Sequence, residues 1–344
     1  MRIAVCGDVH YCKKSSILQR RGSEYTIRLE NLIKTIQWFE QTAKDYGCEF
    51  EVFLGDFFDT ATLDAETITS LKELHWNDLP KAAIVGNHES EDIDLHFSTL
   101  HIFHDKMQVI NKPAKGCTDV EFCYLPYILE SERKPLAEYF GPLGKDKRII
   151  FSHNDIKGIN YGGYVSKIGF DLDEIRANSN LFINGHLHNG TWVNTEKTIL
   201  NLGNCSGENF TENASEYSHN ICIIDTDTMD VTLIENPYAF NFYKIDVNTE
   251  EDLKQLDKIK NNAVLSVRCN KDLVLKAKEL LAEKTDKIVE SRIVITQLIT
   301  GTESEATLDA TTLTVNHIAE FEKCCRMNIE NTDVLEQELS EICK

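Results

Sequence analysis

The stretch Arg2-Ile3-Ala4-Val5-Cys6-Gly7-Asp8-Val9-His10 decides the fold of this 344-residue chain. Its apolar part, Ile3–Cys6, is a short continuous run, which is typical of a strand buried on both faces. The run leads directly into a glycine, a carboxylate and an imidazole. The carboxyl ends of strands in layered α/β sheets converge on a crevice where sites form, so we expect Asp8 and His10 to belong to a functional site.

The same arrangement, an apolar run followed by a polar motif, occurs four more times before residue 190. The further strand candidates are Val52–Leu54, Ala82–Val85, Ile149–Phe151 and Leu181–Ile183. The motifs after them are Gly55-Asp56-Phe57-Phe58-Asp59, Gly86-Asn87-His88-Glu89, Ser152-His153-Asn154 and Gly185-His186-Leu187-His188. Helical patterns lie between the runs, for example Leu29, Leu32, Ile33, Ile36 and Phe39 on one face. This alternation predicts the α/β layered class.

Together the motifs supply seven oxygen and nitrogen ligands and no sulfur: Asp8, His10, Asp56, Asn87, His153, His186 and His188. Such ligands suit Mn²⁺ or Mg²⁺, and also Fe or Zn. A carboxylate has two oxygens, so Asp56 is the natural bridge between two metals. Paired metals of this kind acidify a water nucleophile and usually cleave phosphate esters. His88 cannot easily share the metal that Asn87 binds, so we expect it to stabilise the phosphoryl group or protonate the leaving oxygen.

Composition narrows the class of protein. The hydrophobic share of 42% is ample for a buried core. The N-terminus lacks the apolar stretch of a signal peptide, and no run approaches the roughly 18 apolar residues of a membrane span. We therefore expect a soluble, cytoplasmic protein without a membrane partner, whose eleven scattered cysteines are mostly buried free thiols. The net charge of −20 opposes binding to nucleic acid unless a local basic patch, the metals or a partner supplies the contact.

One stretch offers such a patch. Between Asp8 and Glu24 the chain has four basic residues and no acid. These residues are Lys13, Lys14, Arg20 and Arg21. They could contact a DNA backbone next to the first motif, or form an ordinary solvated loop, and the sequence leaves both open.

The character of the chain changes at about Pro237. A β-α-β-α-β order follows, with candidates at Phe242–Val247, Glu250–Lys260, Val264–Arg268, Leu273–Glu283 and Ile293–Ile295. Residues 301–311 read as a polar linker. Two helix candidates form the tail, with an N-cap at Asn331-Thr332 before the second. They either pack on the chain's own core or dock a partner, through apolar residues that include Ile318, Phe321, Leu335, Leu339 and Ile342.

The succession DxH, GDxxD, GNHE, SH and GHxH resembles the calcineurin-like metallophosphoesterases over residues 1 to about 235. The resemblance implies a two-sheet β-sandwich flanked by helices. Within that family the chain is most similar to the SbcD-type nuclease subunits of double-strand-break-repair nuclease–ATPase complexes, in the version that T-even-like phages carry. This implies a nuclease domain (1–236), a capping domain that selects DNA ends (237–300), the linker, and a helical tail (312–344). In that family the tail binds the coiled coils of an ABC-type ATPase.

The resemblance also implies roles for individual residues. Asp8, His10, Asp56 and His188 would hold the first metal. Asp56, Asn87, His153 and His186 would hold the second. His88 would be the catalytic histidine, and Asp59 could orient it as a carboxylate orients an imidazole.

By the same resemblance the chain is a Mn²⁺-dependent nuclease, with Mg²⁺ as the alternative metal. It would act on DNA as a 3′→5′ exonuclease and single-strand endonuclease in end processing, recombination and repair. It would form a homodimer and, if phage-encoded, work in the bacterial host cytoplasm. Two alternatives stay open: a small-molecule or cyclic-nucleotide phosphodiesterase, and an ATPase-docking scaffold with a vestigial site. A protein phosphatase is disfavoured, because Asp59 is followed by Thr60-Ala61 and not by an arginine that would grip a phosphate monoester.

Overall fold

The computed structural model describes residues 1–13, 15, 18, 20–117, 119–144, 147–159 and 165–296, which belong to one compact unit. Lys14, the predicted linker and the predicted tail with its docking residues lie outside the described residues. Among the described helices, none combines the length and the apolar character that crossing a membrane requires.

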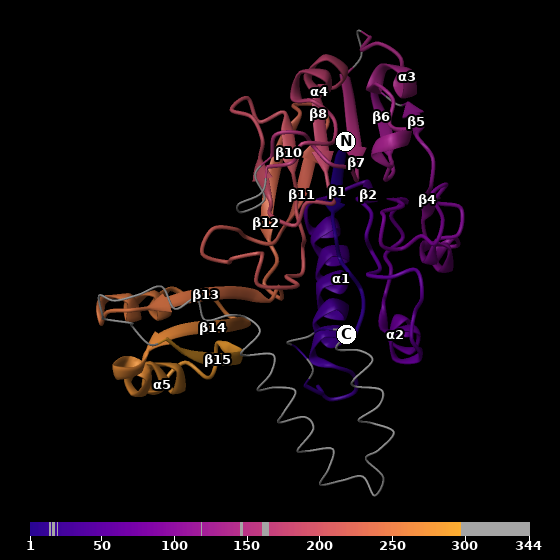
Figure 1. Ribbon diagram of the computed structural model, residues 1–344. Helices are drawn as coiled ribbons and strands as arrows, with labels where there is room; N and C mark the ends of the chain where they lie inside the picture. Colours follow the sequence, from indigo (N-terminus) through magenta and orange to yellow (C-terminus); the bar gives the residue numbers. More distant parts are fainter. Residues whose placement is uncertain are drawn as a thin grey trace, which may run out of the picture. The chain divides into compact units, whose positions relative to one another are not determined.

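Two six-stranded sheets form the larger part of this unit (Figure 1). In the first, the central strands are parallel, and β11 joins β1 antiparallel. Its order is β12 (Asp230–Glu235), β11 (Asn220–Asp225), β1 (Arg2–Cys6), β2 (Phe50–Phe53), β3 (Lys81–Ile84) and β4 (Gln108–Ile110). The order of the second is β5 (Ala114–Cys117), β6 (Val120–Leu125), β7 (Lys147–Ser152), β8 (Leu181–Asn184), β10 (Ile199–Asn201) and β9 (Thr191–Trp192).

The two sheets pack face to face. Their inner faces share one hydrophobic core, to which Val5 and Ile84 contribute from the first sheet and Phe151 and Ile183 from the second. All four side chains are fully buried. The predicted two-sheet sandwich of the α/β class is therefore confirmed.

Helices cover the outer faces. The long helix α1 (Ile27–Asp45) packs on the first sheet through the predicted apolar face, and Ile36 and Phe39 are fully buried. Thr26 caps its start, because its hydroxyl oxygen accepts a hydrogen bond from the Leu29 amide. The short helices α3 (Leu136–Phe140) and α4 (Leu172–Asn178) cover the second sheet. The remaining short helical segments of this part are α2 (Ala65–Ser70), η1 (Leu71–Glu73), η2 (Thr99–Phe103) and η3 (Glu130–Glu132).

A third, parallel sheet is built from β13 (Asn241–Val247), β14 (Ala263–Asn270) and β15 (Ile288–Thr296). Its helical segments are η4 (Glu251–Lys258), η5 (Lys271–Leu273) and α5 (Val274–Ala282). The first of them is a 3₁₀ helix and not the expected α-helix. The strand β15 begins five residues before the predicted run Ile293–Ile295, because the exposed polar residues Glu290, Ser291 and Arg292 separate its first two apolar residues from that run.

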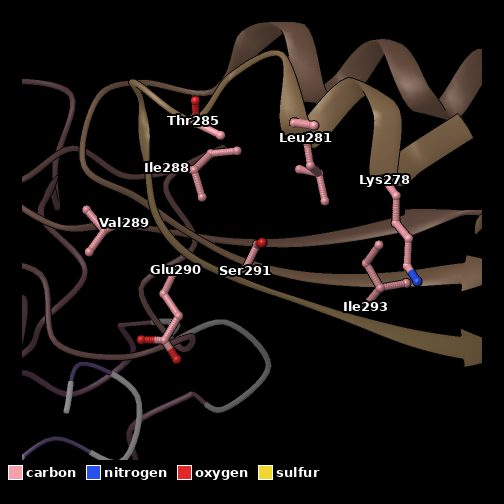
Figure 2. A pocket seen from close by; sticks show the side chains of 9 residues that line it. Lys278, Leu281, Thr285, Ile288, Val289, Glu290, Ser291 and Ile293 are labelled. Carbon is pink, nitrogen blue, oxygen red and sulfur yellow. The ribbon is translucent and has the colours of Figure 1, made fainter. Parts of the chain in front are cut away.

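A cavity of about 540 Å³ lies between α5 and β15 of this small sheet. Figure 2 shows its lining, in which Leu281, Ile288 and Ile293 are accompanied by Lys278 and Glu290. None of its lining residues belongs to the five motifs.

Replacing Ile36 by alanine tests how α1 is anchored. The side chain is fully buried in the outer core, so its removal should lower the free energy of unfolding by about 2–5 kcal/mol. The exposed neighbour Lys34, changed to alanine, should shift it by no more than about 0.5 kcal/mol. Urea unfolding followed by circular dichroism measures both, and equal losses would contradict the packing described here.

Candidate metal centre

The predicted ligands occupy strained turns at the strand ends. Asp8, His10, Asp56 and His186 have φ angles of 45°, 49°, 45° and 73°. This left-handed region costs residues other than glycine about 1–3 kcal/mol, and such strain concentrates at functional sites. The close packing also dictates Gly86, because a Cβ there would collide with the Asp56 carboxylate and amide nitrogen.

These turns bring the ligands together in two clusters. One holds Asp8, His10 and His188, and the other holds Asp56, His153 and His186, with the ligand atoms of each within 4.8 Å of one another. Asn87 joins the second, since its Oδ1 lies 3.1 Å from His153 Nε2.

Asp56 faces both clusters. Its Oδ2 lies 3.0 Å from His153 Nε2 and 3.9 Å from His10 Nε2. A second link is Asp8, whose two carboxylate oxygens accept the His186 amide at 2.8 and 3.0 Å. Asp56 thus has the position that a bridging ligand needs.

Hydrogen bonds fix the orientation of three imidazoles. In each, Nδ1 contacts an oxygen that only accepts, so this nitrogen is the donor. These bonds run from His10 to Asp59 Oδ1 (3.0 Å), from His153 to the Leu54 carbonyl (2.6 Å) and from His188 to Glu212 Oε1 (2.7 Å). A neutral imidazole that donates from Nδ1 has its lone pair on Nε2, as a metal-binding histidine requires. His186 differs, because its Nε2 lies 3.6 Å from Asp155 Oδ2.

The donor set fits divalent cations. His10 Nε2 is buried and has no hydrogen-bond partner, an arrangement that costs free energy unless something binds it. It lies among carboxylate, amide and imidazole groups, which are the ligands that Mn²⁺ and similar ions accept. The residues present therefore fit two cations, one at each cluster.

His88 and Asp59 are arranged differently from the prediction. His88 Nδ1 donates to the backbone carbonyl of Asp59 at 3.1 Å, while the Asp59 carboxylate lies 3.7 Å away. That carboxylate is closer to His10 Nδ1, at 3.0 Å, because His10 is fully buried beneath it. Asp59 therefore orients His10 with its side chain and His88 with its backbone. The His88 side chain is 44% exposed and accessible to a substrate.

Two glutamates that sequence reasoning left without a role support the centre. Glu89 is fully buried, and its two oxygens accept the amides of Gly86 (2.9 Å) and Phe58 (3.0 Å), which ties two motif loops together. Burial, reinforced by the charge of Asp56, raises the pKa of Glu89 to about 8. In the sequence, only the position of Glu89 in the third motif pointed to a role for it. Glu212 belongs to no motif, so no sequence signal pointed to it.

The charges of the predicted ligands and their neighbours shift one another's pKa values before any cation binds. Burial opposes protonation of His153, but the charge and hydrogen bond of Asp56, together with the charge of Asp8 and the bond to the Leu54 carbonyl, outweigh it and raise the pKa of His153 to about 9. Burial likewise opposes protonation of His188, but the hydrogen bond to Glu212 raises the pKa of His188 to about 10. The Asp56 carboxyl is buried, yet the charge of His153 holds its pKa well below the ordinary value.

The predicted basic patch is largely neutralised. Lys13 Nζ lies 3.0 Å from Asp64 and 3.7 Å from Glu66, and Arg21 pairs with the same Glu66. Arg20 is exposed, and Lys14 is outside the described residues. The predicted contact with DNA therefore relies on fewer free charges than the sequence suggested.

Comparison with protein families gives a match over the first part of the chain. Residues 1–190 match the family described as calcineurin-like phosphoesterase. No curated protein matches the chain. Among solved structures, a novel archaeal phosphodiesterase is 14% identical (TM-score 0.35), with 68% of this chain and 99% of that chain covered. A Thermus thermophilus protein is 12% identical with a TM-score of 0.37, and the match covers 68% of this chain and 98% of that chain. A Danio rerio dimetal phosphatase is 14% identical with a TM-score of 0.38, and the match covers 69% of this chain and 99% of that chain.

Glu212→Gln tests the support of His188. The carboxylate accepts from His188 Nδ1 at 2.7 Å and from the Glu208 amide at 3.0 Å, and glutamine has only one acceptor oxygen. We expect the affinity for Mn²⁺, measured by calorimetric titration, to fall about 10–100-fold. The exposed Glu216→Gln is the matched control. An unchanged dissociation constant for Glu212→Gln would remove this role.

Metal binding should release protons. His153 and His188, with pKa values raised to about 9 and 10, are protonated at pH 7 and must become neutral to bind a cation. The apparent affinity for Mn²⁺ should therefore rise with pH, by up to about tenfold per pH unit for each such proton. Titrations at pH 7 in two buffers of different ionisation enthalpy count the protons, and heats that do not depend on the buffer would contradict this expectation.

Proposed function

Because this chain belongs to the calcineurin-like phosphoesterase family, we propose that it is a Mn²⁺-dependent nuclease subunit that hydrolyses the phosphodiesters of DNA. Family membership makes it a metal-binding phosphoesterase, a hydrolase of a family that typically binds two divalent metals. The DNA substrate, the choice of metal and the partner are what we propose. The activity would be that of a 3′→5′ exonuclease and single-strand endonuclease in end processing, recombination and repair.

The paired clusters around Asp56 carry the proposal. Asp8, His10 and His188 with Asp56 would hold one cation. Asn87, His153 and His186 with Asp56 would hold the other. Two cations bound there would neutralise phosphate charge and acidify the water that attacks phosphorus.

His88 is the side chain that would transfer protons during hydrolysis. Its Nδ1 donates to the Asp59 carbonyl, so Nε2 is the nitrogen that can carry a proton to and from a substrate. Its amide also donates to Asp56 Oδ1 at 2.9 Å, which fixes the residue beside the predicted bridging ligand. In this position His88 protonates the leaving oxygen of the diester.

A diester substrate agrees with the charges of the site. A phosphate monoester carries a second negative charge and is usually gripped by arginine. Arg28, fully buried below the first motif, directs its donors to the carbonyl oxygens of His10 and Gly207. Thr60 and Ala61 follow Asp59 where protein phosphatases have arginine and glycine.

The proposed partners follow from the resemblance of the motifs and of the C-terminal third. The cap (237–300) would select DNA ends, the tail (312–344) would dock an ABC-type ATPase, and the protein would act as a homodimer. A net charge of −20 makes help from such a partner in holding DNA reasonable.

A small-molecule phosphodiesterase is the second candidate. The ion pairs of Lys13 and Arg21 with acidic residues favour it, because they leave less positive charge beside the centre for a DNA backbone.

Cleavage by purified protein tests the proposal. With Mn²⁺, linear duplex and single-stranded DNA should be degraded. Asp56→Ala should abolish cleavage because both predicted cation sites lose a ligand. His88→Ala should reduce kcat about 10²–10⁴-fold at unchanged metal content. The exposed Asp230→Ala is the control, and metal content is measured by mass spectrometry.

Full activity of Asp56→Ala would refute the two-cation centre. Hydrolysis of a chromogenic diester without cleavage of DNA, also after addition of the ATPase, would favour the second candidate.

A further inference from the structure

A groove leads away from the second cluster. Its first part is a hollow of about 290 Å³ that begins at Asn87 and is walled by Ile93 and Tyr127. Its second part, about 240 Å³, shares Ile93 and Tyr127 with the first and continues to Lys112 and Lys134. The two hollows share four lining residues, Ile93, Leu95, Tyr127 and Leu129, so they adjoin each other and are together called the groove.

The groove begins next to the predicted metal ligands. Asn87 Oδ1 lies 3.1 Å from His153 Nε2, and the ring of Tyr127 lies 5.6 Å from the ring of His186. The Tyr127 amide donates to the Val85 carbonyl at 3.0 Å, so the residue is held at the end of β3. A substrate whose phosphate lies at the clusters therefore extends past this aromatic ring.

The walls of the first hollow suit a neutral, flat group. Ile93 is 70% exposed, so its side chain is accessible to a substrate in this hollow. Aromatic rings with apolar neighbours bind nucleobases by stacking, without regard to sequence. Glu91 and Asp92, which also line this hollow, would repel a phosphate but not a base.

The second hollow suits a phosphate. Lys112 and Lys134 are exposed, and in the described part of the chain neither ammonium forms an ion pair, in contrast to Lys13 and Arg21. Asp94 and Glu132 line the same hollow, so the lysines provide for one phosphate and not for a long basic track.

From this adjacency of the two hollows to the second cluster we propose, resting on the proposed function, that the groove binds one strand of a nucleic acid beside the scissile phosphate. The adjoining base lies between Tyr127 and Ile93, and the next phosphate lies at Lys112 and Lys134. Pockets for drug-sized ligands measure about 300–1,000 Å³, so each hollow has the size for one nucleotide unit or less. The groove thus gives the centre its preference for a single-stranded nucleotide chain.

Three substrates separate the contributions of the groove. Methyl p-nitrophenyl phosphate has no base, thymidine 5′-p-nitrophenyl phosphate adds one base to the same leaving group, and a short oligothymidylate has bases and further phosphates. We would measure kcat and KM of the full chain with Mn²⁺ on all three, and on the oligonucleotide with the ATPase as well.

Variants of the apolar wall should act on base-containing substrates. Ile93→Ala and Tyr127→Ala should raise KM for the thymidine ester and the oligonucleotide about tenfold, and leave KM for methyl p-nitrophenyl phosphate unchanged. Tyr127→Phe keeps the ring and should restore the wild-type KM. Ile93 is exposed, so its variant does not depend on refolding of a core. Ile68→Ala, at another exposed isoleucine, is the control.

The joint variant Lys112→Ala with Lys134→Ala should raise KM for the oligonucleotide alone, and this increase should shrink at high salt. Equal effects of all variants on the three substrates, or none, would overturn the groove assignment while DNA cleavage by the wild type stands. A wild type that hydrolyses the chromogenic diester but never the oligonucleotide would instead overturn the proposed function.

Discussion

Asp56 contacts three other motifs at once. Its carboxylate lies 3.0 Å from His153 Nε2, accepts the His88 amide at 2.9 Å and approaches His10 Nε2 at 3.9 Å. These contacts require a left-handed turn at Asp56 and a residue without a Cβ at Gly86. Strands far apart in sequence must therefore end at the same level of the sandwich, and the shared core between the two sheets holds them there.

Hydrogen-bond acceptors behind the histidines orient the imidazole rings so that they can bind metal. Asp59, the Leu54 carbonyl and Glu212 each accept a hydrogen bond from the Nδ1 of one histidine. Each Nε2 is thereby left as the nitrogen that can bind a cation once it carries no proton, and the fixed ring orientation reduces the reorganisation that binding requires. The same arrangement concentrates charge, and it is why His153 and His188 hold protons in the absence of metal.

The sequence predicted the parts of the centre whose position depends on local chain order. A strand that leads into Asp8 or Asp56 places that side chain at the end of the sheet whatever the rest of the chain does, so the motifs pointed to the residues that the structure brings together as candidate ligands. Glu212 could not be found in this way, because it reaches His188 only when the chain returns after β10. The contact of the Asp59 carboxylate with His10 was not predicted for a related reason: the motif gives the distance of Asp59 from His88 along the chain, but not the position of the buried His10.

The segment that carries Glu212 also connects the centre to the small sheet. Two residues after Glu212, the Ala214 amide donates to the Phe242 carbonyl of β13 at 2.8 Å, and the Phe240 amide donates to the Ser206 carbonyl at 2.9 Å. These two backbone hydrogen bonds anchor the segment that carries Glu212 between the metal centre and the third sheet, so the position of the residue that orients His188 depends on this sheet as well.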